Sequence, residues 1–215
     1  MPHDTRLRQA FALSLLALFC GCGALRPSTE PPPAFFALER PANAAARSAA
    51  QAPANGSTLI VDAPVAAAGF DSQRIIYIRK PHELEYFAHN QWIDTPARML
   101  GPLIVSALER SAAFRAVVHA PSAGTGELRL DTEIIRLQHE FLQQPSRVHF
   151  TLRATVVDST TRRVLATREF DAFAAAPSEN PYGGVLAASQ VVAGVLDELA
   201  AFCAGIKPLR QDSPK

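Results

Sequence analysis

Residues 128–173, LRLDTEIIRLQHEFLQQPSRVHFTLRATVVDSTTRRVLATREFDAF, decide the fold of this chain. Apolar and polar residues alternate along three runs, at 128–141, 148–156 and 164–173. Turn residues separate these runs, at 143–146 and 158–162. Within the first run the apolar positions shift by one residue at Ile134-Ile135, and such a shift predicts a β-bulge. The segment therefore predicts a three-stranded antiparallel meander.

Shorter apolar runs bounded by turn residues predict additional strands, at 35–38, 58–62, 74–80, 83–87 and 116–119. The runs at 74–80 and 83–87 flank Pro81-His82, so we expect them to form a hairpin.

Two segments have helical patterns. Residues 95–111 begin with Thr95-Pro96, a favourable helix start, but Pro102 predicts either a kink or a helix that begins there. Residues 183–203 carry one apolar stripe, formed by Val185, Leu186, Ser189, Val192, Leu196, Leu199 and Phe202. The predicted fold class is α+β, with an antiparallel or mixed β-sheet and two main helices, at about 95–111 and 183–203, packed on it.

The first residues have the pattern of an export signal. A basic start is followed by an apolar run at 11–19, which is much shorter than the ~20 residues that cross a membrane. The run ends in Cys20-Gly21-Cys22, which resembles the lipobox of bacterial lipoproteins, so Cys22 is the predicted lipidation site. A plain signal peptide and an uncleaved anchor are the alternatives. By similarity to enterobacterial lipoproteins, Gly23 implies sorting to the outer membrane.

These features predict four parts of the chain: a signal peptide at 1–21, a lipidated Pro/Ala-rich tether at 22–57, a single domain at 58–205 and a flexible tail at 206–215. The chain has 21 Lys and Arg against 20 Asp and Glu, and removal of Arg6, Arg8 and Asp4 with the signal leaves 19 of each. A neutral chain is unsuited to nucleic acid and has no polybasic strip for anionic lipid. Cys203, the one cysteine of the predicted domain, is expected to be buried and inert.

Catalytic and metal-binding patterns are not found in the sequence. No His pair has helical ligand spacing, and no nucleophile elbow or phosphate-binding glycine loop occurs. We therefore expect no enzyme activity, no metal and no cofactor. His139 and His149 are placed to face each other across the turn at 143–146. Two half-exposed strand residues are the favoured interpretation, and a metal or acid–base pair is the alternative.

Four aromatic residues gather in a polar segment: Tyr77, Tyr86, Phe87 and Trp92. They either pack the predicted hairpin onto the sheet or form a surface that contacts a protein partner, because Tyr and Trp are favoured at interfaces. We name them as candidate partner-contact residues.

The same segment, RIIYIRKPHELEYFAHNQWIDTPARML, carries a family resemblance together with ALERSAAFRAVV, ELRLDTEIIRLQHEF, VHFTLRATVVD and RRVLATREF. These runs resemble the ABC-type transport auxiliary lipoprotein component family from about Phe35 to Cys203, with Tyr86 and Trp92-x-Asp94 as the sharpest marks.

The resemblance implies a non-catalytic accessory lipoprotein of an MCE-domain ABC transport system, which moves lipids or other hydrophobic molecules across the cell envelope. Its implied partners are a periplasmic MCE-domain protein and, through it, an ABC permease and an ATPase. A ring-shaped homo-oligomer is also implied. The protein would dock its partner from the periplasmic leaflet of the outer membrane, with the inner membrane as the alternative site. The competing functions are a lipoprotein that holds a lipid between the sheet and the C-terminal helix, and a structural envelope lipoprotein.

Overall fold

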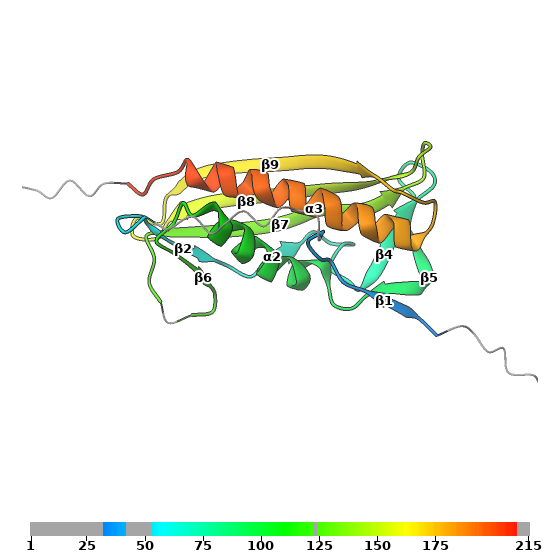
Figure 1. Ribbon diagram of the computed structural model, residues 1–215, viewed down its shortest axis with the longest axis horizontal. Helices are drawn as coiled ribbons and strands as arrows, with labels where there is room; N and C mark the ends of the chain where they lie inside the picture. The colour runs from blue at the N-terminus through cyan, green and yellow to red at the C-terminus, as the bar shows by residue number, and fades with distance from the viewer. Residues whose placement is uncertain (1–31, 42–52, 123, 210–215) are drawn as a thin grey trace, which may run out of the picture. The chain divides into compact units, whose positions relative to one another are not determined.

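Three long antiparallel strands form one side of the sheet in the computed structural model, which describes residues 32–41, 53–122 and 124–209. They are β7 (Leu128–Glu140), β8 (Arg147–Asp158) and β9 (Val164–Ala175) (Figure 1). The register of β7 against β8 shifts between Ile134 and Arg136, which confirms the predicted bulge. The predicted signal peptide, Cys22 and most of the tether lie outside the described residues.

The other edge of β7 is shared by three short parallel strands: β2 (Thr58–Val61), β3 (Val65–Ala66) and β4 (Arg74–Ile78). Three more strands extend the sheet beyond these: β6 (Ala116–His119) beside β2, β5 (Glu85–Trp92) antiparallel to β4, and β1 (Ala34–Phe36) parallel to β5. The sheet is therefore mixed, and the predicted hairpin is confirmed. β1 belongs to this sheet although it precedes the predicted domain in the chain.

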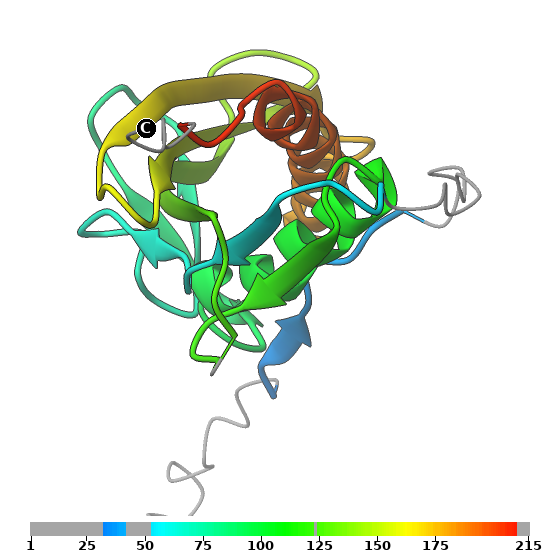
Figure 2. The same ribbon diagram turned by 90° about the vertical axis from the view of Figure 1, so that its left-hand side faces the viewer.

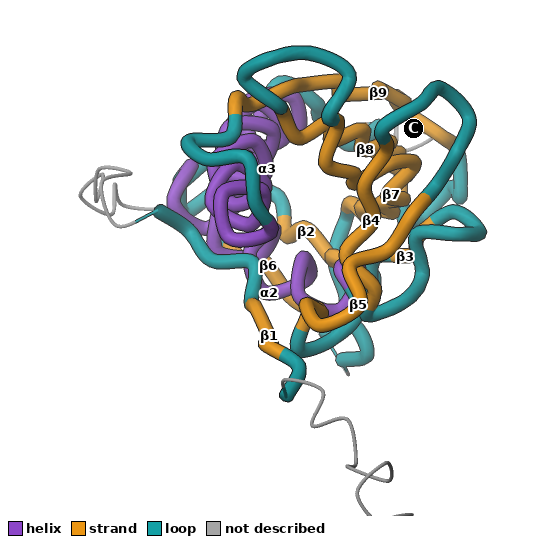
Figure 3. The backbone as a smooth tube through the Cα atoms, turned by 90° about the vertical axis from the view of Figure 1, so that its right-hand side faces the viewer, coloured by secondary structure: helices purple, strands orange, loops and turns teal. Residues whose placement is uncertain are grey.

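Both helices lie on the same side of the sheet and contact each other (Figures 2 and 3). The longer helix α3 (Pro181–Ala204) covers β8 and β9, whereas α2 (Pro96–Ser111) lies over β2, β3 and β6. This arrangement confirms the α+β class. α3 is long and apolar enough to cross a membrane by length and composition, yet more than half of its most apolar stretch is buried within this domain.

The sequence left two possibilities for the helix that contains Pro102: a kink at Pro102, or a helix that begins there. The helix begins at Pro96 and continues through Pro102, so a helix that begins at Pro102 is wrong. Thr95 takes the N-cap position, but its side chain makes no capping hydrogen bond. We attribute the tolerance of Pro102 to tertiary packing, because Leu100 and Ile104 on either side of it are fully buried.

The core fills the space between the sheet and the helices. Its fully buried large side chains come from every layer and include Phe150, Leu59, Leu100, Ile104, Leu130, Ile134, Leu152 and Leu199. Leu186 is the exception to the predicted stripe of α3, since it is 43% exposed. α3 instead buries two sides, one against the sheet and one against α2, and small residues such as Ala187 and Ala188 allow this close approach.

Candidate functional site

The four aromatic candidates do not share one surface. Trp92 is 4% exposed and belongs to the core, whereas Tyr77 and Phe87 are half-buried. The Tyr77 and Phe87 rings lie 4.4 Å apart, and Phe141 meets Tyr77 edge-on at 5.9 Å. Tyr86 alone of the four is well exposed, at 41%. Three of these rings therefore pack against the hairpin or the core, and Tyr86 lies on the surface.

Charged groups surround the hairpin rings. The Arg74 guanidinium lies 4.8 Å from the centre of the Tyr86 ring, a cation–π arrangement. The Tyr77 hydroxyl donates a hydrogen bond to Glu85, 3.0 Å away, and Glu85 also accepts from Arg79. Burial and this acceptor raise the pKa of Tyr77, whereas the hydrogen bond from Arg79 lowers the pKa of Glu85.

A groove of about 650 Å³ lies between the segment that follows β1 and the first half of α3. Phe35, Tyr182 and Leu186 line it and are 56%, 58% and 43% exposed. The Phe36 ring lies 6.3 Å from the Tyr182 ring and links β1 to α3. An aromatic and aliphatic patch thus remains open on the surface where these two elements meet.

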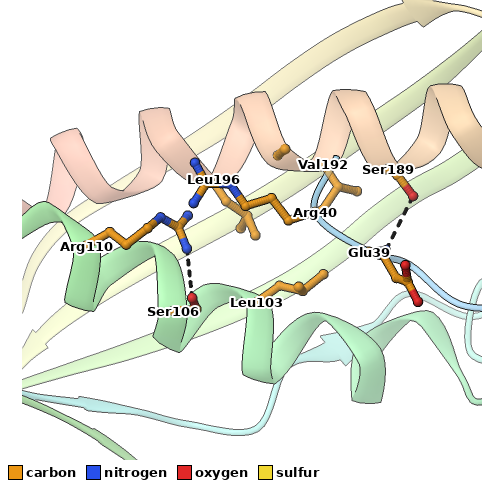
Figure 4. A pocket seen from close by; sticks show the side chains of 9 residues that line it. Glu39, Arg40, Leu103, Ser106, Arg110, Ser189, Val192 and Leu196 are labelled. Atoms are coloured by element: carbon orange, nitrogen blue, oxygen red, sulfur yellow. Dashed lines mark hydrogen bonds between the residues drawn. The ribbon is translucent and has the colours of Figure 1, made fainter. Parts of the chain in front are cut away.

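The segment after β1 continues across the seam between the two helices and forms a pocket of about 50 Å³ there (Figure 4). The Arg40 and Arg110 side chains reach toward each other over this seam, and Arg110 donates to the Ser106 hydroxyl at 2.7 Å. Burial lowers the pKa of Arg110, and the charge of Arg40 lowers it further. Asp197, 3.7 Å from Arg110, offsets part of this positive charge. The pocket has little spare volume. We therefore interpret the segment after β1 as a cover over the line of contact between α2 and α3.

The space between the sheet and α3 is filled. The cavity found there measures about 10 Å³ and is lined by residues that include Trp92, Leu137, His139 and Ala188. That volume accommodates about one water molecule. A lipid pocket between the sheet and the C-terminal helix is therefore not supported by the described part of the chain.

His139 lies on the core side of β7, beneath the start of α3. Its Nε2 is 2.8 Å from the Ser146 hydroxyl, and burial lowers its pKa. Among the described residues its Nδ1 has no hydrogen-bond partner. A methyl group added at Gly184 would come within 2.4 Å of this nitrogen, so glycine permits the close approach of helix and ring.

His149 lies on the opposite face of the sheet, because its partner in the register is Gln138 and that of His139 is Val148. The two histidines therefore do not face each other, and the half-exposed interpretation is also wrong, since both rings are buried. Both residues lie between the turn and the bulge, so the turn, which pairs Glu140 with Arg147, sets this register, and the sequence does not show that pairing.

The partners of His149 form a polar network on that face. Nδ1 is 3.0 Å from Glu140 and Nε2 is 2.7 Å from Asp171, while the Phe173 ring stacks on the imidazole with centres 3.9 Å apart. Burial opposes ionisation of Glu140, but hydrogen bonds from Gln138, His149 and an arginine outweigh it and lower its pKa. Within the described ranges no group of three or more His, Cys, Asp or Glu side chains is placed to hold a metal ion. The network ties together the ends of β7, β8 and β9.

Cys203 lies on the buried side of α3. Its side chain is 1% exposed, and burial raises the pKa of its thiol to about 12. A thiol with that pKa stays protonated at neutral pH, and access to it is closed. The expectation of a buried, inert cysteine is confirmed.

Comparisons with known proteins agree with this fold. The sequence model of the ABC-type transport auxiliary lipoprotein component family matches residues 36–200. Protein XCC0632 from Xanthomonas campestris is 24% identical in sequence, with a TM-score of 0.67 over 80% of this chain and 95% of its own. A second crystal structure, of an uncharacterized protein, is 12% identical, with a TM-score of 0.62 over 80% and 99% of the two chains. At these identities the two structures are evidence for the fold alone. No match was found among curated protein sequences.

Proposed function

Since the chain belongs to the ABC-type transport auxiliary lipoprotein component family, we propose that it is a non-catalytic, membrane-anchored accessory component of an MCE-type ABC transport system. That system moves lipids or other hydrophobic molecules across the cell envelope. The observation that carries the proposal is the extent of the family match, which runs from the end of β1 into the last turns of α3. The match to the family therefore covers nearly the whole described fold and does not depend on one short motif.

The anchor in this proposal is Cys22, acylated after removal of residues 1–21 and inserted in the periplasmic leaflet of the outer membrane. Labelled palmitate fed to cells is expected to enter the wild-type protein but not the Cys22→Ser variant. Incorporation that persists in Cys22→Ser would refute this anchor. Separation of the inner and outer membranes then locates the wild-type protein, and Gly23 leads us to expect it in the outer membrane.

The partner in this proposal is a periplasmic MCE-domain protein, through which the chain associates with the permease and the ATPase. Tyr86 and the adjacent Arg74 are both exposed on the β4–β5 hairpin and support a contact there. Tyr and Arg are among the residue types enriched at energetically important interface positions. Tyr77, Phe87 and Trp92 would then shape the hairpin from behind.

In-cell photo-crosslinking tests this contact. A photo-reactive amino acid replaces Tyr86 in one variant and Val164, which is 62% exposed at the start of β9, in a control variant. Trp92 is unsuitable because it is buried. Capture of an MCE-domain protein from position 86 and not from 164 supports the proposal. Capture of only other copies of the chain from both positions contradicts it and favours the structural envelope lipoprotein.

A further inference from the structure

Three exposed apolar side chains gather where β1 meets the start of α3: Phe35, Tyr182 and Leu186, here called the β1–α3 patch. Phe35 and Tyr182 are more than half exposed, and they come from segments almost 150 positions apart in the sequence. Clustered exposed apolar residues commonly mark a contact site, unlike apolar residues scattered singly. The groove of about 650 Å³ beside them leaves the patch open.

The patch is not explained by the packing of the domain. Leu186 points away from the sheet, although its neighbours Val185 and Ala187 are buried. Phe36, rather than Phe35, makes the aromatic contact that joins β1 to α3. Tyr182 is the partner of Phe36 in that contact, yet it stays 58% exposed, so the fold uses part of its side chain and leaves the rest, like much of Phe35 and Leu186, in solvent.

The position of β1 in the chain indicates what covers the patch. Eleven residues lie between Cys22 and Ala34, the first residue of β1. A fully extended chain of this length spans at most about 40 Å. If Cys22 is lipidated, β1 is therefore held close to the membrane surface, and the apolar patch beside it lies within reach of the bilayer.

We propose that Phe35, Tyr182 and Leu186 insert into the headgroup region of the membrane that holds the lipid anchor, so that the domain is oriented as well as tethered. The inference rests on the proposed acylation of Cys22. Aromatic side chains such as Tyr are favoured at the membrane–water boundary because they pair an apolar ring with a polar tip. The acyl chains supply the attachment, and the patch supplies the orientation.

The charges beside the patch specify the kind of lipid surface. Glu39 and Arg40 both line the groove and carry opposite charges, and the predicted mature chain is neutral. Insertion is therefore driven by apolar contact and needs no anionic lipid. We expect the same depth of insertion in vesicles of phosphatidylcholine alone and in vesicles that also contain an anionic lipid, at low and at high salt.

The proposal fixes which end of the domain meets the membrane. The patch lies at the beginning of α3, a helix of 24 residues, which at 1.5 Å per residue is about 36 Å long. The opposite end of α3 lies near the start of β9 (Figure 1). That end would stand away from the bilayer and point into the periplasm.

Spin labels on the full lipidated chain in phosphatidylcholine vesicles test the insertion. One label is attached in Tyr182→Cys, one in Leu186→Cys and, as the control, one in Val164→Cys; all three positions are exposed, so labelling leaves the core intact. Cys203 is buried and will not react. The readout is the collision rate of each label with oxygen, which concentrates in the bilayer, relative to a water-soluble nickel chelate.

The expected result is a several-fold rise of the oxygen-to-nickel ratio at 182 and 186 on transfer from detergent to vesicles, with no rise at 164. Labels at 182 and 186 that stay accessible to nickel on chains that float with the vesicles would overturn the insertion and leave the anchor intact. Protection from both reagents, with spin–spin broadening between chains, would overturn it in favour of a second copy. Failure of the chain to float would instead refute the anchor.

Discussion

The two sides of α3 differ in what they contribute. The side toward the sheet and α2 is fully packed: Leu199 and Ala187 are completely buried, and Gly184 lies directly against His139. The side toward β1 leaves Tyr182 58% and Leu186 43% exposed beside an open groove. One helix therefore stabilises the fold through its buried sides and leaves its exposed side available for contact. Substitutions on the two sides should therefore have different consequences.

The largest expected effect is that of truncating a leucine on the buried side. Leu199→Ala should lower the free energy of unfolding by about 2–5 kcal/mol, because it deletes core methyl groups and leaves a cavity. Leu186→Ala on the same helix is the matched control and should change it by about 0.5 kcal/mol or less, as for surface positions. Chemical denaturation of both variants measures the difference. Equal losses would mean that the two sides of α3 do not differ in this way.

Two glycines of α3 allow the same test with a smaller expected change in the free energy of unfolding. Gly184→Ala should destabilise by about 1–3 kcal/mol, because the new methyl group would overlap the His139 ring and force the helix or the ring to move. Gly194→Ala, whose methyl group would meet no atom within 4 Å, should stabilise by up to about 1 kcal/mol through helix propensity. A neutral Gly184→Ala would show that α3 does not approach β7 as closely as described.

The smallest expected effect is the pH dependence that His139 confers. Burial lowers its pKa below the ordinary value of 6.5, so the unfolded chain binds a proton at a pH where the folded chain does not. The contribution of neutral His139 to the free energy of unfolding is therefore fully present above pH 6.5 and is lost as the pH decreases below that value. In His139→Asn this contribution is absent, so the advantage of the wild type over the variant should shrink on acidification. An advantage that stays constant between pH 7.5 and pH 5, measured by denaturant titration, would contradict a neutral buried His139.

Local pattern predicted the meander, its bulge and both helices, because these elements have long runs with a clear period. The parallel pairing of β2, β3 and β4 with β7 was not predicted, since it joins residues about 60 to 70 positions apart and β3 has only two residues. The contact between the helices gave α3 a second buried side, which is why one stripe could not describe it and Leu186 was misplaced. Both the lipidation of Cys22 and a partner contact by the aromatic candidates remain predictions.

The placement of single side chains was the least predictable property. His139 and His149 are ten positions apart on neighbouring strands, but the register places them on opposite faces of the sheet. Trp92 ends β5 and points into the core, whereas Tyr86, on the same strand, is exposed. The β1–α3 patch forms only when β1 joins the sheet, so no local pattern contains it.

The proposed association with an MCE-domain protein can be tested without any crosslinker. The most direct measurement is affinity purification of the full-length protein, tagged at its C-terminus, from gently solubilised envelopes, followed by identification and quantification of the proteins that accompany it. The account predicts an MCE-domain protein in comparable amount, joined by an ABC permease and an ATPase, and a loss of all three in Tyr86→Asp. Recovery of only the lipoprotein itself, under conditions that keep the MCE protein bound to its own permease, would contradict the account.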